Sequence, residues 1–163
     1  MARNVFYSFH YDKDAWRASQ VRNMGVVEGN VPARDNDWES VKRGGDAAIE
    51  RWIDAQMSGR SCAVVLIGAE TATRKWVKHE IKRAWELRKG VVGVYIHQLK
   101  DLNGATANKG VNPFNAFNIS GTDFNRIVKT YDSPYYDSKQ AYSYIYSNLA
   151  SWIDEAIAIR ARY

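Results

Sequence analysis

The chain has 163 residues, of which 45% are hydrophobic, 25% charged and 13% aromatic. This composition is typical of a globular domain and excludes wholesale disorder, and a chain of this length buries ~70% of its unfolded surface. The net charge of +5 is a mild basic bias that is too small to indicate nucleic-acid binding. A single cysteine, Cys62, excludes an intrachain disulfide and a cysteine-based zinc site. We therefore predict one domain over residues 1–163, with no metal site.

The first half of the chain begins with a strand, a helix, a long connection and a second helix. These elements are predicted at residues 5–9, about 14–24, 25–43 and about 46–57. The spacing of Trp16, Val21 and Met24 predicts that they form the inner face of the first helix. Gly59 is placed to end the second helix. The long connection is expected to be functional, because loops of that length are uncommon in compact domains.

The second half of the chain continues the alternation of strands and helices. A strand, a helix, two strands and a long closing helix are predicted at residues 61–67, about 73–89, 91–96, 126–131 and about 138–160. Thr73 and Gly90 are the expected start and end signals of the helix between them. The closing helix has the clearest inward stripe: Tyr142, Ile145, Tyr146, Leu149, Trp152, Ile153, Ala156 and Ile157. The alternation predicts an α/β fold with a central, mostly parallel sheet.

Common nucleotide-binding and catalytic signatures are absent from the sequence. No glycine-rich dinucleotide fingerprint or phosphate loop follows the first strand, and the three histidines lack metal-ligand spacing. In a doubly wound sheet the site lies beyond the carboxyl ends of the strands. Three segments would meet there: residues 8–11, 35–38 and 68–80.

Five segments in unbroken order resemble the TIR-like domains of bacterial Thoeris antiphage defence, in particular its NAD-consuming, cyclase-type TIR-like proteins. They are residues 5–11, 37–39, 64–68, 74–81 and 109–114, and the correspondence extends to about residue 117. The resemblance implies a flavodoxin-like, three-layer TIR-like fold. It also implies an enzyme that uses NAD to make a cyclic ADP-ribose isomer, which activates a partner effector.

The resemblance assigns the catalytic carboxylate to Glu80, within Trp76-Val77-Lys78-His79-Glu80-Ile81. Glu80 lies beside the predicted Val77/Ile81 stripe, so its carboxylate is expected at the margin of the buried face. Cleavage of the nicotinamide–ribose bond develops positive charge on the ribose, and one carboxylate can stabilise that charge. The alternative is a solvated glutamate that pairs with Arg83 or Lys78.

The remaining candidate residues are assigned to substrate binding, each with a structural alternative. Ser8 and His10 would bond a ribose or phosphate, or else cap the helix that begins nearby. Asp35 and Asp37 would bond ribose hydroxyls or form an Asx-type turn. Arg74 would face a pyrophosphate or be surface charge.

Aromatic residues are candidates for a dry enclosure that keeps water from the reacting ribose. Phe9, Tyr11, Trp38 and Trp76 could stack around the substrate, although each ring alone is more often part of a core. Residues 97–125 carry no assigned role.

Two alternatives to a cyclase remain open at this point: a plain NAD glycohydrolase and a non-catalytic TIR-like scaffold. NAD is expected as a consumed substrate, with no bound cofactor. The expected partners are an effector reached through a diffusible nucleotide, a phage trigger and a second copy of the chain, with no nucleic acid and no membrane. The sequence begins without a signal-peptide pattern and has no membrane span, which favours a cytoplasmic location.

Overall fold

The computed structural model describes residues 3–29 and 40–163. A five-stranded sheet with the order β2-β1-β3-β4-β7 lies at its centre, and every strand pair in it is parallel. The strands are β1 Asn4–Ser8, β2 Glu28–Gly29, β3 Cys62–Ile67, β4 Gly90–Tyr95 and β7 Lys129–Tyr131. The predicted α/β class with a parallel sheet is therefore confirmed.

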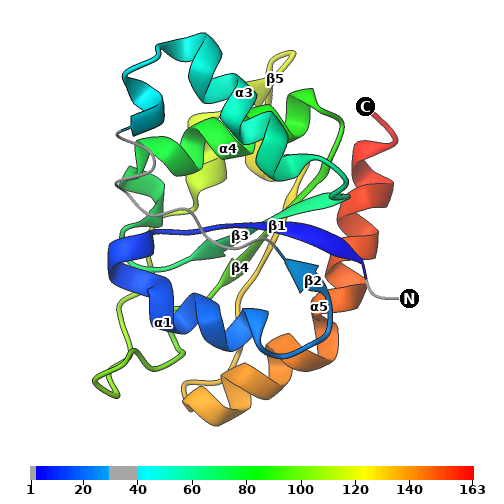
Figure 1. The fold of residues 1–163 in the computed structure, drawn as a ribbon. Helices are drawn as coiled ribbons and strands as arrows, with labels where there is room; N and C mark the ends of the chain where they lie inside the picture. The colour runs from blue at the N-terminus through cyan, green and yellow to red at the C-terminus, as the bar shows by residue number, and fades with distance from the viewer. Residues whose placement is uncertain (1–2, 30–39) are drawn as a thin grey trace.

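Four helices cover the two faces of the sheet. They are α1 Tyr11–Arg22, α3 Asp46–Met57, α4 Lys75–Glu86 and α5 Ser138–Arg160. Helices α1 and α5 lie on one face, whereas α3 and α4 lie on the other (Figure 1). This three-layer arrangement is the flavodoxin-like sandwich, with α3 and α5 at the bounds that the sequence predicts.

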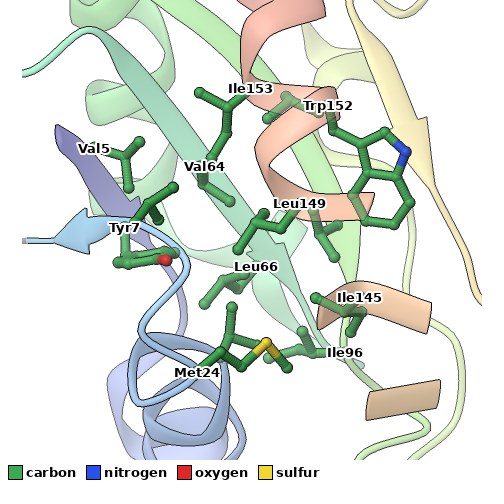
Figure 2. Close-up of a cluster of buried hydrophobic side chains, with 14 of the residues drawn as sticks. Val5, Tyr7, Met24, Val64, Leu66, Ile96, Ile145, Leu149, Trp152 and Ile153 are labelled. Carbon is green, nitrogen blue, oxygen red and sulfur yellow. The ribbon is translucent and has the colours of Figure 1, made fainter. Parts of the chain in front are cut away.

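Two hydrophobic clusters, one on each face of the sheet, hold the layers together. On the α1/α5 face, Val64 and Leu66 of β3 lie against Leu149 and Ile153 of α5 (Figure 2). On the α3/α4 face, Phe6 of β1 belongs to the cluster that contains the inner residues of both helices. All residues of β3 and β4 are buried, because helices cover these central strands on both sides. Their continuous apolar runs thus reflect their position in the sheet.

The inner faces of two helices differ from the sequence prediction. Trp16 and Tyr146 were expected inside but are 51% and 52% exposed. On α1 the inner positions are taken by Asp14 and Arg17, which pair through Arg17 Nη1 and Asp14 Oδ1 at 2.9 Å. Periodicity placed Val21 and Met24 correctly, since both are buried, but it misassigned Trp16 because a buried charged pair can have the same spacing as an apolar stripe.

The first helix begins earlier than predicted, at Tyr11 and not near residue 14. The side chain of His10 accepts a hydrogen bond from the backbone N–H of Lys13 and so caps the helix at its N-terminus. Histidine is a less common cap than serine or aspartate, which is why the sequence pattern did not reveal this boundary.

The predicted end signals of α4 are also wrong by a few residues. Thr73 does not cap the helix; it ends a short 3₁₀ turn, Thr71–Thr73, and its hydroxyl donates to the carbonyl of Glu70. Arg74 is the N-cap residue instead. Gly90 is the first residue of β4, and the chain turns at Arg88, which adopts a positive φ of 61°.

Residues 97–128 form an irregular segment that leaves the carboxyl end of β4 and then packs on the α3/α4 side of the sheet. They contain a two-stranded antiparallel hairpin, β5 Asn118–Ile119 and β6 Thr122–Asp123, and two 3₁₀ turns, Pro113–Ala116 and Phe124–Arg126. Phe114 and Phe124 are fully buried and meet edge to face. The segment is therefore anchored in the α3/α4-side cluster.

No helix in the described residues is long and apolar enough to cross a membrane.

Candidate functional site

The carboxyl ends of β1 and β3 mark the point where the strand order reverses. From β1 the chain passes through α1 to β2 on one side, and β3 lies on the other side of β1. In open α/β sheets, ligands bind in the crevice at such a switch point. The residues that follow β1 and β3, and the start of α4, are therefore the place to look for a site.

Glu80 and Ser8 meet at this switch point. The hydroxyl of Ser8, the last residue of β1, donates a hydrogen bond to Oε1 of Glu80 at 2.7 Å. Glu80 is 6% exposed and Ser8 is 1% exposed. The structure thus joins two of the predicted site residues that are 72 positions apart in the chain.

The electrostatic setting of Glu80 differs from that of a solvated glutamate. Burial raises the pKa of Glu80 to about 8, and the hydrogen bond from Ser8 opposes that rise. Arg83, the suggested surface partner, pairs instead with Asp54 through two hydrogen bonds of 2.6 and 2.9 Å. The alternative of a solvated, ion-paired Glu80 is therefore excluded. Strongly perturbed carboxyl groups of this kind cluster at functional sites.

His10 takes the structural alternative that the sequence left open for it. Its Nδ1 accepts from the backbone of Lys13 at 3.2 Å, and the residue is 7% exposed. Burial lowers the pKa of His10, and the positive charge of Arg74 lowers it further. Two residues of the segment 8–11 therefore make different contacts. Ser8 donates to the candidate catalytic carboxyl group, whereas His10 caps the N-terminus of α1.

The aromatic candidates occupy two separate places in the described structure. Phe9 and Tyr11 stack on each other with ring centroids 6.3 Å apart. Trp76 lies one helical turn before Glu80, is half-buried and stacks on His79 at 6.4 Å. The positions predicted to line the site together with them, Asp35 and Trp38, lie outside the described residues.

The start of α4 carries a basic pair that suits an anionic group. Arg74 is the N-cap residue, Lys75 is the first helical residue, and the first turn contains no acidic residue. Cations at a helix N-terminus are unfavourable against the helix dipole, and an anion there would offset this. The geometry is thus compatible with the predicted pyrophosphate contact of Arg74.

Asp14 is a buried carboxyl group at the switch point that the sequence analysis did not select. It is 1% exposed, and its Oδ2 has no hydrogen-bond partner within the described residues. A Cβ atom on Gly68, the residue after β3, would overlap this carboxylate, so the two segments touch through the glycine backbone. Acidic residues are common in the first turn of a helix, where they interact favourably with the helix dipole. Asp14 therefore gave no sequence signal of its contact with Gly68.

Gly110 brings a third segment of the chain to the end of β3. A Cβ atom on Gly110 would overlap the carbonyl oxygen of Gly68 and meet the backbone of Ala69. The segment from Lys109 to Phe114 therefore lies directly against the end of β3.

Among the described residues, no group of three or more His, Cys, Asp or Glu side chains could hold a metal ion.

Comparisons with known proteins identify the family to which the chain belongs. Residues 6–101, more than half of the chain, match the family described as the Thoeris protein ThsB, TIR-like domain. The chain is also 38% identical over 119 residues to "Putative cyclic ADP-D-ribose synthase ThsB1" of Bacillus cereus (strain MSX-D12). That match covers 70% of this chain and 62% of the relative, so it spans less than two thirds of the relative's length. The chain belongs to the Thoeris ThsB family of TIR-like domain proteins.

Proposed function

We propose that this protein is a TIR-like enzyme that cleaves NAD at the nicotinamide–ribose bond. It then closes the remaining ADP-ribose into a cyclic isomer, which serves as a second messenger for an antiphage effector. Membership of the ThsB family and the name of the Bacillus cereus relative support this proposal. The observation that carries it is the buried Glu80 carboxyl group, bonded to Ser8 at the switch point of the sheet.

The chemistry of bond cleavage matches what Glu80 offers. Nicotinamide leaves as a neutral molecule, so its departure needs no general acid. Positive charge develops on the ribose, and a carboxylate in a poorly solvated site stabilises that charge far more than it would in water. The positive nicotinamide ring of bound NAD favours the ionised form of Glu80, although burial holds its pKa high in the free protein.

Ring closure requires that a hydroxyl of the same molecule reaches the ribose carbon before water does. Its oxygen forms the new bond as the nicotinamide bond breaks, and ionised Glu80 can accept its proton. NAD is thus consumed as a substrate and does not remain as a cofactor. If water attacks instead, the product is linear ADP-ribose, as in a plain glycohydrolase.

The test is NAD turnover by wild type and Glu80→Gln, both alone and in lysates of phage-infected cells, with products resolved by mass spectrometry. We expect a product that lacks one water relative to linear ADP-ribose, and a loss of about 10²–10³-fold or more in Glu80→Gln. Glu86→Gln is the matched control, because Glu86 is an exposed residue of the same helix. It should behave as wild type.

Each other outcome selects a different function. Linear ADP-ribose alone would identify a glycohydrolase. Identical nucleotide profiles for wild type and Glu80→Gln, with both still protecting cells, would overturn the enzyme proposal in favour of a scaffold.

A further inference from the structure

A second polar cluster lies at the carboxyl ends of β4 and β7, outside the site around Glu80. It consists of His97, Lys109 and Asp132, and we call it the His97 cluster. His97 Nε2 is 4.0 Å from Asp132 Oδ1, and Lys109 Nζ is 3.1 Å from Asp132 Oδ2. Lys109 Nζ also lies 4.6 Å from the ring centroid of Tyr95. Three segments thus bring donors and acceptors together at one edge of the sheet.

The His97 cluster has unsatisfied hydrogen-bonding capacity. His97 is only 4% exposed, yet its Nδ1 has no partner within residues 3–29 and 40–163, and the same holds for the buried Asp132 Oδ1. The 4.0 Å between His97 Nε2 and Asp132 Oδ1 is too long for a hydrogen bond. Buried polar atoms are almost always paired, because an unpaired one costs ~1–3 kcal/mol. Two of them in one cluster mark a place where a polar ligand would find hydrogen-bond partners.

The donors and acceptors of the His97 cluster select a hydroxyl group. Burial lowers the pKa of His97, which favours the neutral ring with one donor and one acceptor. A hydroxyl can accept from Nε2 of the imidazole and donate to Asp132 Oδ1, so it bridges the 4.0 Å between these two atoms and satisfies the unpaired carboxylate oxygen. A phosphate offers only acceptors and would face the Asp132 carboxylate. A sugar hydroxyl is therefore the better match.

Lys109 extends this match toward a nucleotide. Its side chain is 54% exposed, so it can move from its position over Tyr95 as a ligand enters. A lysine beside a ribose site supplies a cation for the pyrophosphate that a nucleotide carries next to its ribose. The neighbouring Gly110 lies against Gly68, so the backbone at Lys109 is held near the edge of the sheet where the Glu80 site lies, while its side chain can move.

The His97 cluster and Glu80 are placed for the two ends of one dinucleotide. Ser8 pairs with Val65, which in turn pairs with Gly93, so β1 and β4 are separated only by β3. Neighbouring strands lie ~4.8 Å apart, which puts β1 and β4 ~10 Å apart. Tyr95, in edge-to-face contact with the ring of His97, belongs to the α3/α4-side cluster, the face that Glu80 also occupies.

We propose that the His97 cluster binds the ribose of the adenosine half of NAD while Glu80 holds the nicotinamide ribose. This inference rests on the function proposed above and adds a specific role: the cluster determines whether the product is cyclic or linear. No bond forms or breaks at the cluster. It holds the adenosine half close to the reacting carbon, so that a hydroxyl of that half reaches it before water does.

Two variants of the full chain test this proposal, His97→Leu and Asp132→Asn. Each should weaken the binding of ADP-ribose, measured by calorimetric titration, about tenfold or more, because His97→Leu removes a hydrogen-bond donor and Asp132→Asn replaces a charged acceptor by a weaker neutral one. Each should also shift the products of NAD turnover at saturating NAD from cyclic to linear, measured as the ratio of the two products. Asp154→Asn is the control, because Asp154 is exposed and forms a single surface ion pair with Arg3.

The titration and the turnover assay separate this proposal from the proposed function. Unchanged ADP-ribose affinity in both variants would overturn the role of the cluster, even if Glu80 proves essential. If wild type releases no nicotinamide, the proposed function fails, and the ADP-ribose titration still decides whether the cluster is a nucleotide site. Thermal melting checks the fold of each variant. If His97→Leu does not fold, Asp132→Asn decides alone, because it preserves the shape of the side chain.

Discussion

At the scale of single residues, the candidate site depends on a carboxyl group that the fold keeps out of water. Glu80 is buried and accepts a hydrogen bond from Ser8. Such a group destabilises the folded protein when it is charged, and this is the property that lets it stabilise a cationic transition state. The cost to stability and the benefit to catalysis have the same origin, so one substitution should change both.

The stability of the protein should reveal this cost through its pH dependence. The pKa of Glu80 is raised from 4.5 to about 8 in the folded state, so the folded protein binds more protons than the unfolded chain between these values. The contribution of protonated Glu80 to the free energy of unfolding is fully present below pH 4.5 and is lost as the pH rises through 8. Glutamine is neutral at every pH and keeps an acceptor for Ser8.

Glu80→Gln should therefore melt at the temperature of wild type near pH 4.5 and at a higher temperature near pH 8. Each kcal/mol corresponds to ~2–4 °C for a domain of this size, so the expected gap is several degrees. Thermal denaturation followed by circular dichroism at both pH values measures it. A gap that does not change with pH would show that Glu80 is not buried in its charged form.

At the scale of elements, close backbone contacts hold helices and loops against the sheet. The clearest case is Gly90, at the start of β4. A Cβ atom there would lie 2.8 Å from the backbone nitrogen of Ile157 in α5. The backbone of α5 therefore lies so close to β4 that no side chain fits at position 90. The role of Gly90 is to allow this contact, and not to end α4.

Gly90→Ala should destabilise the protein by about 1–3 kcal/mol, because the new methyl group meets helix backbone that cannot move aside cheaply. Equilibrium unfolding in urea measures this change. Ser61→Ala is the control, because Ser61 lies beside Gly90 and its backbone carbonyl accepts from the Gly90 N–H, a bond that the change leaves intact. Equal stability of Gly90→Ala and wild type would mean that α5 can shift outward without loss.

At the scale of the whole molecule, two hydrophobic layers share one sheet. The residues of β3 alternate between the α1/α5-side cluster and the α3/α4-side cluster, as Cys62, Val64 and Leu66 do against Ala63 and Val65. Loss of either layer would expose one apolar face of the same central strands to water. The chain should therefore unfold as one unit.

Urea unfolding should show a single transition with the same midpoint by tryptophan fluorescence and by far-ultraviolet circular dichroism. Trp85 reports on the α3/α4 side and Trp152 on the α1/α5 side, so the fluorescence samples both layers. Two separate midpoints would contradict the prediction of a single domain over residues 1–163.

Much of the fold could be predicted from local patterns in the chain. The apolar runs of β3 and β4 and the periodicity of α5 are strong because each element is covered on its full length by neighbours. The boundaries of α1 and α4 could not be predicted, because they depend on a histidine cap and a 3₁₀ turn that have no strong sequence signal.

By itself, the sequence determined the α/β class, the order of the four helices and of the longer strands and, through its resemblance to the Thoeris TIR-like domains, the choice of Glu80; the short strands β2, β5 and β6 were not predicted. Only the tertiary structure decided that Glu80 meets Ser8, that His10 is a cap and that His97 lies beside Asp132. The reason is physical: secondary structure follows from neighbours a few positions apart, whereas these contacts join strand ends that the parallel sheet brings to one edge. Burial, and with it the raised pKa of Glu80, arises only when that edge is assembled.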